Sequence, residues 1–549
     1  MNYEKLAELL FPNINKTTDY YENKYPQRDC KGEVTRFAPS PTGFLHIGHF
    51  FGSLIDSRIA SSSNGVFYFR LEDTDKKREI QGAGLVALEV MKIFGIVPDE
   101  GLMPDGTEKG NYGPYVQSQR LEIYHTYAKE LVRQGKAFPC FCEKADNKAE
   151  IIERREQQLQ ESDTIVEHDP CRDLTFEEIE EKLKAGKPFA IRLKSMNKDG
   201  DKIKIYDEIK GEREIPANTK DVVLLKSDGI PPYCFAHAVD DHLMRTTLVV
   251  RGEEWFASLA SHIEIFDALG FKYVKYAHTP VICKLGEEGN KRKISKSKDP
   301  EADMRFYLKD GYPKNAVIEY LLNLANSNFE EWRTKNPFAD NHEFNFTAKK
   351  LGASNPMFDI MKLNDISKTI ISKMNTEECF NHLYEYACSY DNEFKTYIDN
   401  NKEYVKSVLS IDREVPKPRK DIAKWSEVKD YYNFMFGEVS SYDFDKEKFS
   451  ADDIKEVLKA YKEVYNETDD KVQWFDRVKS VCAPLNFCAD MKAYKQNPEQ
   501  YKGNVADLST IIRVAITGKR NTPDLCAIMQ ILGKEEVEKR LEKVISSKA

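Results

Sequence analysis

The stretch of sequence that decides the fold is Arg36-Phe37-Ala38-Pro39-Ser40-Pro41-Thr42-Gly43-Phe44-Leu45-His46-Ile47-Gly48-His49. It predicts the end of a strand, a turn marked by prolines and a glycine, and the first turn of a helix. Two of its histidines, His46 and His49, are expected on one face of that helix. A helix N-terminus favours anions, and Gly48 lets a flat ring approach the backbone. The stretch therefore predicts a nucleotide phosphate site that fits ATP, although histidines beside a Pro-rich turn are also typical of a polar surface.

A second, basic segment lies far downstream, at Lys291-Arg292-Lys293-Ile294-Ser295-Lys296-Ser297-Lys298. It has no hydrophobic period and follows two glycines, which is typical of a mobile loop. Lysine ammonium groups that close over a substrate can neutralise charge on a leaving pyrophosphate. A basic loop by itself is more often a solvated surface, so its interpretation depends on the first segment.

The order of the two segments resembles that of the class I aminoacyl-tRNA synthetases. The resemblance is carried by an HxGH-type element, His46-Ile47-Gly48-His49, and by a later KxSKS-type loop, Lys293-Ile294-Ser295-Lys296-Ser297. Three further stretches are similar to the glutamyl-tRNA synthetases of bacterial type: RFAPSPTG, Leu71-Glu72-Asp73-Thr74-Asp75, and the block from Lys226 through Trp255. The resemblance covers the chain from about Val34 to the C-terminus.

The resemblance implies a ligase that activates L-glutamate with ATP and Mg²⁺, releases pyrophosphate, and transfers glutamate to the 3′ end of a tRNA. Such a protein mainly positions its substrates and stabilises charge. The implied catalytic residues are His46, His49, Lys293 and Lys296. The implied ATP contacts are His46, Gly48, His49, Ile294, Ser295 and Lys296. The tRNA is expected to be tRNA-Glu, and the sequence leaves open whether tRNA-Gln is charged as well.

Glutamate recognition is expected to depend on guanidinium groups, because these pair with a planar carboxylate through two donors. By motif match the implied glutamate-binding residues are Arg36, Ala38, Ser40, Glu72, Tyr233, His237 and Arg251. Glu72 would bind the amino group. His237 departs from the family pattern, which more often has Asn there. An ordinary ion pair between Arg36 and Glu72 is the alternative interpretation of those two residues.

Composition agrees with a large multidomain protein but does not identify it. The chain has 549 residues, a formal net charge of −9 and 11 cysteines. This charge argues against a globally basic nucleic-acid binder but leaves room for local basic surfaces. Irregularly spaced cysteines without a signal sequence predict reduced thiols in a cytoplasmic protein. No apolar run approaches the length of a membrane span. The protein is expected to be a monomer.

The expected fold is an α/β Rossmann-like catalytic domain with an α+β insertion, followed by an all-helical C-terminal anticodon-binding region. Strand and helix alternate over 34–94, which predicts a parallel sheet. Strand-like sequence is expected to resume at Val222 to Leu225, after the insertion. The predicted divisions are an N-terminal extension (1–33), the first catalytic half (34–136), an acceptor-binding insertion (137–219), the second catalytic half (220–300), a helical stem-contact connector (301–372) and a helical anticodon-binding domain (373–549).

Cys140 and Cys142 form a C-x-C pair, and Cys171 follows, with His168 three residues before it. Some members of the family bind a structural zinc ion in this insertion through a similar pattern. Thiolates and imidazole suit tetrahedral zinc, so these four residues are the candidate ligands. Three buried free cysteines are the alternative, and the fourth ligand is not settled by the sequence.

The C-terminal part resembles the bacterial anticodon-binding domain at 503–508 and 515–518. Its basic candidates for tRNA contact are Arg413, Lys417, Arg419 and Lys420, although a solvated helix face is an equal alternative for each. A glutaminyl-tRNA synthetase would carry β-barrel sequence here instead. A non-catalytic tRNA-binding paralogue is disfavoured because the histidines and lysines of both motifs are intact.

Overall fold

The computed structural model describes residues 1–142 and 169–547. These residues form two compact units, which we describe separately. Unit 1 contains Met1–Phe306 and Ile318–Asp359, and unit 2 contains Tyr307–Val317 and Ile360–Ala549. Among the described residues, no helix has both the length and the apolar character needed to cross a membrane.

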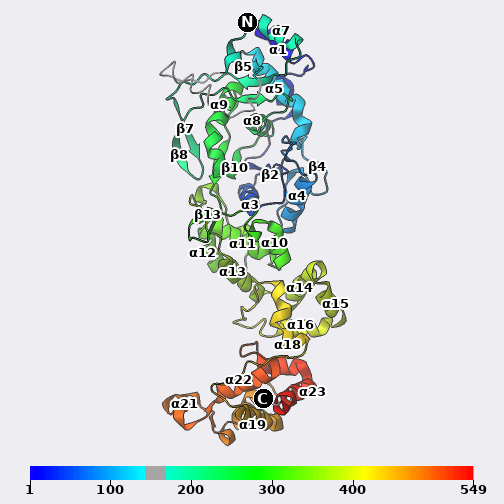
Figure 1. The fold of residues 1–549 in the computed structure, drawn as a ribbon, viewed down its shortest axis with the longest axis vertical. Helices are drawn as coiled ribbons and strands as arrows, with labels where there is room; N and C mark the ends of the chain where they lie inside the picture. The colour runs from blue at the N-terminus through cyan, green and yellow to red at the C-terminus, as the bar shows by residue number, and fades with distance from the viewer. Residues whose placement is uncertain (143–168, 548–549) are drawn as a thin grey trace. The chain divides into compact units, whose positions relative to one another are not determined.

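The first sheet of unit 1 has the order β1-β2-β3-β4, and its first three strands run parallel. The strands are β1 (Val34–Phe37), β2 (Val66–Phe69), β3 (Glu100–Leu102) and β4 (Glu108–Lys109), joined by helices α3 (Ile47–Ser62) and α4 (Ala83–Ile93). All four residues of β1 are buried, as expected of a parallel strand covered on both faces. The predicted alternation of strand and helix is therefore confirmed (Figure 1).

The second sheet continues beside the first. Its order is β10-β11-β7-β8, with β10 (Leu248–Gly252) parallel to β11 (Lys275–Thr279). Thr247 N donates to Val34 O at 3.0 Å, so β10 lies next to β1. Helices α8 (Tyr233–Leu243) and α9 (Leu259–Leu269) belong to this half. In an open parallel sheet, ligands bind outside the carboxyl ends of the strands where the strand order reverses, which here is between β1 and β10.

One strand lies in a different sheet from the one that the sequence predicts. Strand β9 (Val223–Leu225), expected to begin the second catalytic half, instead pairs with β6 (Ala190–Leu193), which also pairs with β5 (Ala137–Cys140). Strand β7 (Lys202–Asp207), within the expected insertion, pairs with β11 and with β8 (Gly211–Pro216). Short strands look alike along the chain, and their sheet membership depends on distant partners.

The basic segment is also more ordered than the expected loop. Its first residues form β13 (Lys291–Lys293), which pairs antiparallel with β12 (Cys283–Leu285). The remaining helices among the described residues of unit 1 are α1 (Tyr3–Leu10), α2 (Thr18–Lys24), α5 (Leu121–Arg133), α7 (Phe176–Lys184) and α12 (Asn328–Lys335). Both α1 and α2 pack on α5, so the N-terminal extension is part of the core of this unit.

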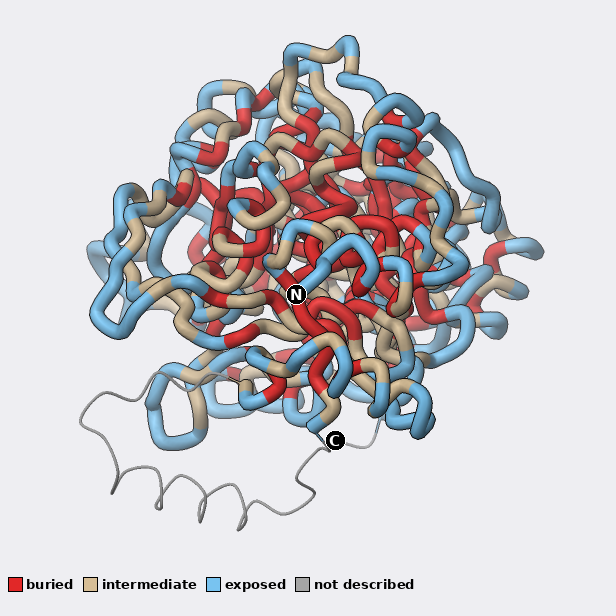
Figure 2. Tube along the Cα trace, turned by 90° about the horizontal axis from the view of Figure 1, so that it is seen from above, coloured by how far each residue is buried: buried red, intermediate tan, exposed pale blue. Residues whose placement is uncertain are grey.

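Unit 2 is built from amphipathic helices around one core. Figure 2 colours the buried residues of the described chain red and the exposed ones pale blue. Helix α22 (Val505–Thr517) is capped at its start by Asn504, whose side chain accepts from two backbone N–H groups, and at its end by Gly518, with φ 77°. Helices α10 (Met304–Asp310) and α11 (Lys314–Ala325) contribute residues to both units. The helices of unit 2 are α13 (Ile360–Lys373), α14 (Thr376–Tyr390), α15 (Asn392–Asn400), α16 (Lys402–Ser410), α17 (Val428–Tyr431), α18 (Asn433–Phe436), α19 (Ala451–Val464), α20 (Lys471–Ser480), α21 (Met491–Gln496), α22 (Val505–Thr517) and α23 (Leu525–Ser546).

The helical prediction for this unit is confirmed, with one small addition. A parallel pair of two-residue strands joins β14 (Phe487–Cys488) to β15 (Gly503–Asn504). Gly533 adopts φ 77° inside α23 and separates it into two helical parts.

Candidate active site

A cavity of about 890 Å³ opens at the carboxyl ends of β1 and β10. It contains most of the residues that the sequence predicts for catalysis, ATP and glutamate, although they are spread over 259 positions of the chain from Arg36 to Ile294. Ser295, Lys296 and His237 are the three of these that do not line it. The predicted residues on its wall are Arg36, Ala38, Ser40, His46, Gly48, His49, Glu72, Tyr233, Arg251, Lys293 and Ile294.

His46 lies just before the helix rather than inside its first turn. It is the N-cap of α3, and its Nδ1 accepts from Gly48 N at 3.0 Å. Accepting through Nδ1 leaves the ring proton on Nε2. Burial, with the nearby charges of His49 and the motif lysines, lowers the pKa of His46 to about 4. The imidazole is therefore neutral at pH 7.

His49 lies within α3, 6.1 Å from His46 between ring centroids. Burial also lowers the pKa of His49. Both rings are thus neutral hydrogen-bonding groups at physiological pH. The expected convergence of the two imidazoles is observed, with the correction that only one of them belongs to the helix.

The two sequence motifs meet in space. Lys296 Nζ donates to the carbonyl of Phe44 at 3.2 Å and lies 4.8 Å from the centre of the Phe44 ring. Lys293 lies at the cavity wall, 3.7 Å from the Glu254 carboxylate. Burial lowers the pKa of Lys296.

Asp299 anchors the basic segment. Its carboxylate accepts from both terminal nitrogens of Arg292, at 2.6 and 2.7 Å, and from Ser295 N at 2.8 Å. Asp299 is 4% exposed and directly follows the basic segment, but the sequence gives no signal of its role. Its contacts fix the backbone from which the motif lysines extend.

The other end of the cavity carries two arginines. Arg36 donates through Nε to Asp241, at 3.3 Å to Oδ2, and through Nη1 to Val250 O at 3.4 Å. Arg251 donates through Nη1 to the Tyr233 hydroxyl at 3.4 Å. Among the described residues, Arg251 Nη2 is buried without a hydrogen-bond partner. This end is therefore suited to a carboxylate.

Glu72 does not pair with Arg36, which excludes the ordinary ion pair between them in this structure. Its Oε1 accepts from Arg70 Nη2 at 2.9 Å and from Gln117 Nε2 at 3.5 Å. Burial raises the pKa of Glu72, and the charges of Arg70 and Arg36 oppose that rise. Glu72 thus presents its side chain at the cavity wall with two close donors among the residues that the structure describes.

His237, predicted to contact glutamate, is fully buried behind the cavity wall. Its Nε2 is hydrogen-bonded to the Tyr276 hydroxyl at 3.0 Å, and its Nδ1 contacts the Asp241 carboxylate. The ring is stacked on Tyr233, with centroids 5.4 Å apart. Burial lowers its pKa to about 4. The ring supports Tyr233 and Asp241 rather than forming part of the surface that a ligand meets.

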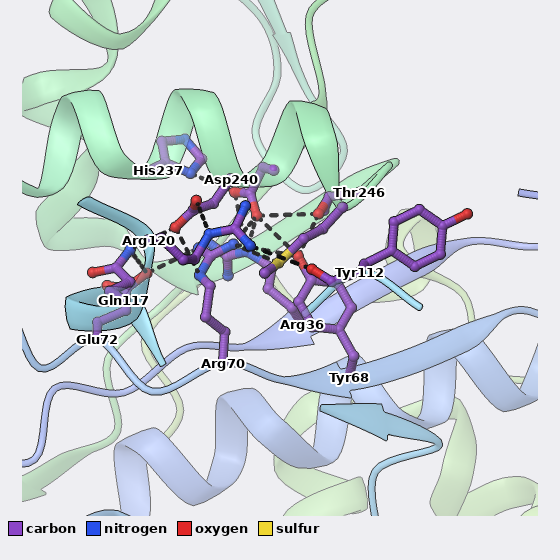
Figure 3. A network of polar contacts seen from close by, with 12 residues as sticks. Arg36, Tyr68, Arg70, Glu72, Tyr112, Gln117, Arg120, His237, Asp240 and Thr246 are labelled. Atoms are coloured by element: carbon purple, nitrogen blue, oxygen red, sulfur yellow. Dashed lines mark hydrogen bonds and ion pairs between the residues drawn. The ribbon is translucent and has the colours of Figure 1, made fainter. Parts of the chain in front are cut away.

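A buried polar network lies beneath this end of the cavity (Figure 3). Asp241 accepts from Arg70 Nη1 at 2.7 Å as well as from Arg36. Asp240 accepts from Arg120 Nε and from the Tyr124 hydroxyl, each at 2.7 Å. Burial alone would raise the pKa of Asp241, but Arg70 and Arg36 hold it well below its usual range. Sequence reasoning missed this network.

Comparison with known proteins agrees with this geometry. Residues 33–365 match the family described as tRNA synthetases class I (E and Q), catalytic domain, and residues 380–545 match an anticodon binding domain. The chain belongs to the class I tRNA synthetases for Glu and Gln. It is 45% identical to a glutamate–tRNA ligase of Clostridium perfringens over the full length of both chains.

Two further similarities extend over nearly the whole chain. A glutamate–tRNA ligase of Acetivibrio thermocellus is 43% identical, with 99% of this chain and 100% of the relative covered. The crystal structure of a glutamate tRNA ligase from Elizabethkingia meningosepticum has 25% sequence identity and a TM-score of 0.73, covering 94% of this chain and all of that one. The fold class expected from the sequence, that of a class I synthetase with a helical anticodon-binding region, is confirmed.

In this class I synthetase the three predicted cysteines converge. The ligand atoms of Cys140, Cys142, Cys171 and Asp169 all lie within 4.8 Å of one another. The sulfurs of Cys142 and Cys171 are 3.7 Å apart, close to the edge of a tetrahedron with Zn–S bonds of about 2.3 Å. His168, the predicted fourth ligand, lies outside the described residues. Asp169 supplies the fourth group in this structure and was missed from the sequence.

The candidate anticodon-side residues do not form one free basic surface. Arg413 donates to the carbonyls of Leu409 and Ile371, at 2.8 and 2.7 Å, and so holds backbone together. Arg419 pairs with Asp421 at 2.6 Å. Lys417 and Lys420 are exposed, and they remain the better candidates for phosphate contact.

Asp241→Asn is predicted to destabilise unit 1, because it leaves two buried guanidinium groups without their shared counter-charge. The expected loss is about 3–5 kcal/mol, the usual cost of breaking a buried ion pair on one side. The measurement is amide hydrogen exchange in β1 and β10, which reports local free energies of opening.

The matched control is Glu331→Gln, which removes an exposed carboxylate paired with Lys335 and should leave protection unchanged. Because the folded pKa of Asp241 is depressed, its contribution is complete above the unfolded pKa of about 3.9 and is lost as the pH falls toward the folded pKa. Equal protection in Asp241→Asn and the native chain at pH 7 would contradict this account.

Proposed function

We propose that this chain is a glutamate–tRNA ligase that uses ATP to form glutamyl-adenylate and then esterifies the 3′ end of tRNA-Glu. The observation that carries the proposal is one cavity with two arginines at one end and the His46, His49 and Lys293 cluster at the other. Full-length relatives named glutamate–tRNA ligase support the same reaction.

Glutamate is assigned to the arginine end of the cavity. The side-chain carboxylate would pair with Arg36 and with the free edge of Arg251, since guanidinium groups match planar oxygens through two donors. Tyr233 would add its hydroxyl. Glu72 would bind the substrate ammonium group, for which its buried carboxylate provides the counter-charge. Ala38 and Ser40 line the adjoining wall.

ATP is assigned to the histidine end. His46 and His49, both neutral, would hold oxygens near the α-phosphate, and Gly48 leaves room for the nucleotide at the start of α3. Ile294 and Ser295 would contact the nucleotide through the motif backbone. Lys296 and Lys293 would neutralise charge that develops on the pyrophosphate as it leaves.

A bound Mg²⁺ would supply positive charge that offsets the charge of the ATP phosphates. Glu254, a carboxylate that lines the cavity beside Lys293, is the residue that would hold it. The chain's own groups would then align the α-carboxylate of glutamate with the α-phosphate and hold both in one cavity.

The tRNA is assigned to surfaces on both units. The segment 137–219 would contact the acceptor end, 301–372 the stem, and 373–549 the anticodon, with Lys417 and Lys420 as phosphate contacts. The helical unit 2 and its match to an anticodon binding domain disfavour the alternative of a glutaminyl-tRNA synthetase with a β-barrel. Charging of tRNA-Gln in addition to tRNA-Glu is a matter of specificity within the same activity.

The direct test is charging of purified tRNA-Glu and tRNA-Gln with labelled glutamate, at defined salt because phosphate contacts make tRNA affinity salt-dependent. The native chain is expected to esterify tRNA-Glu. Lys296→Ala should lower adenylate formation about 10²–10³-fold with little change in the KM for glutamate, because it removes one charge that acts on the transition state.

Lys298→Ala is the matched control, since this lysine is exposed in the same segment. It should retain native rates. Unchanged turnover in Lys296→Ala would refute its assigned role, and failure to charge either tRNA would refute the proposed function.

We further propose that Cys140, Cys142 and Cys171 hold a structural zinc ion. The convergence of three sulfurs with one carboxylate matches the donor set of a closed tetrahedral site. Cys140 is the last residue of β5, and Cys171 lies shortly before α7. A zinc ion at this site would brace this part of the chain and take no part in catalysis.

Metal analysis of protein purified without chelators should find about one zinc ion per chain, and Cys142→Ser should lose it. Cys388→Ser, at an exposed cysteine far from the cluster in the sequence, should keep the metal. Comparing Asp169→Asn with His168→Asn identifies the fourth ligand by which variant releases zinc. A zinc content near zero in the native protein would end the proposal.

A further inference from the structure

Arg251 is held by two buried histidines that the reaction, as described above, does not use. Its Nε donates to His278 Nε2 at 3.0 Å, and its Nη1 is hydrogen-bonded to His262 Nδ1 at 2.9 Å. The guanidinium also lies 4.7 Å from the centre of the Tyr276 ring. Since an arginine only donates, both histidine nitrogens that face it must be unprotonated acceptors.

Asp207 determines which nitrogen of His278 carries the proton. Its Oδ2 is 2.7 Å from His278 Nδ1 and 3.0 Å from His278 N. Its Oδ1 accepts from the backbone N–H groups of Ile209 and Lys210, at 2.9 and 2.8 Å. Both carboxylate oxygens are therefore surrounded by donors, which favours the ionised form and a proton on His278 Nδ1.

The charge states agree with this arrangement. Burial would raise the pKa of Asp207, but its hydrogen bond with His278 and the backbone donors lower it. Burial lowers the pKa of His278. At neutral pH the pair is thus a carboxylate and a neutral imidazole, and the imidazole turns its Nε2 lone pair toward Arg251.

We propose that Asp207 and His278 form a positioning pair that fixes Arg251 through its Nε, so that the Nη2 edge stays turned to the glutamate carboxylate. Neither residue of the pair would touch the substrate. The inference rests on the proposed assignment of Arg251 to glutamate. It gives the hairpin β7–β8, which lies between the two catalytic halves in sequence, a direct part in building the glutamate site.

The topology explains how a residue from that segment reaches the cavity. Asp207 is the last residue of β7 and pairs with Tyr276 of β11, two residues before His278. Asp207, His278 and Arg251 are each at most 7% exposed. Backbone pairing between β7 and β11 holds Asp207 beside His278, and burial restricts both side chains. Such a rigid pair is suited to orienting the Arg251 guanidinium.

Asp207→Asn tests the pair, because an amide has one acceptor where the carboxylate has two. The Asn N–H₂ group toward His278 would favour the tautomer with a proton on Nε2, opposite Arg251 Nε–H. The KM for glutamate in ATP–pyrophosphate exchange should rise roughly tenfold to a hundredfold, as expected for a misplaced binding group, while the KM for ATP stays unchanged. Glu214→Gln, at an exposed residue of β8, is the matched control and should show native constants.

Two variants of His278 separate positioning from folding. His278→Gln keeps an acceptor oxygen for Arg251 and a donor for Asp207, so it should retain most of the affinity for glutamate. His278→Leu fills a similar volume without an acceptor, and it should raise the KM for glutamate as Asp207→Asn does. Equal constants for these two variants would overturn the proposal.

The tautomer can be measured without any substitution, by ¹⁵N NMR of the native chain labelled at histidine. A proton on His278 Nδ1 is expected. A proton on Nε2 would overturn the proposed positioning pair, regardless of the KM values of the variants. Failure of the underlying assignment is distinguished by Arg251→Gln: if that variant leaves the KM for glutamate unchanged, Arg251 does not bind glutamate, even with His278 in the expected tautomer.

Discussion

The carboxylate of Asp241 lies between Arg36 and Arg70, and the remainder of the arginine end of the cavity is arranged around it. Three buried arginines, Arg36, Arg70 and Arg120, face three buried carboxylates, Asp240, Asp241 and Glu72. Such a network gains little stability over an apolar core of the same volume, but it becomes costly when one partner is missing. The charge balance therefore acts mainly as a constraint on geometry, because each guanidinium has a defined partner and direction.

Helix α8 transmits this constraint to the cavity. It carries Tyr233 on the cavity wall and His237 behind it. Asp240 and Asp241 follow one turn later on the same helix. One rigid helix therefore positions both Tyr233 and the two buried carboxylates. The carboxyl ends of β1 and β10 supply Arg36 and Arg251. Rigid strands and a buried helix hold the binding groups before any ligand arrives, which lowers the cost of ordering them on binding. The histidine end follows the same principle, with α3 and the anchored motif segment meeting at Phe44.

The sequence predicts the groups on the cavity wall much better than it predicts the groups behind them. Arg36, His46 and Gly48 lie in one segment whose turn and helix start can be recognised locally. Asp240 and Asp241 cannot be recognised in this way, because an acidic pair within a helix is usually solvated. The distant Arg36, Arg70 and Arg120 provide the counter-charges for their burial. His237 was misplaced for the same reason: its spacing puts it near Tyr233, but its exposure depends on Tyr276, which is 39 residues away.

Sheet membership shows the same limit. Strand β9 was expected in the wrong sheet, and the sequence assigned β7 to no sheet, since three to six residues do not specify which distant strand they will pair with. The unpredicted pairing of β7 with β11 is what brings Asp207 to Arg251. The cysteine cluster was predictable because the chemistry of its residue types restricts them, but Asp169 was not, since a carboxylate beside a proline gives no such signal.

A structure of the full chain with bound L-glutamate tests whether the buried network positions the binding groups in advance. The side-chain carboxylate is expected to contact both Arg36 and Arg251 Nη2. Arg36 Nε should keep its bond to Asp241, and Arg251 Nε should keep its bond to His278. Glutamate bound elsewhere in the cavity, or an Arg36 that leaves Asp241 to reach it, would contradict the claim that the buried network positions the binding groups in advance.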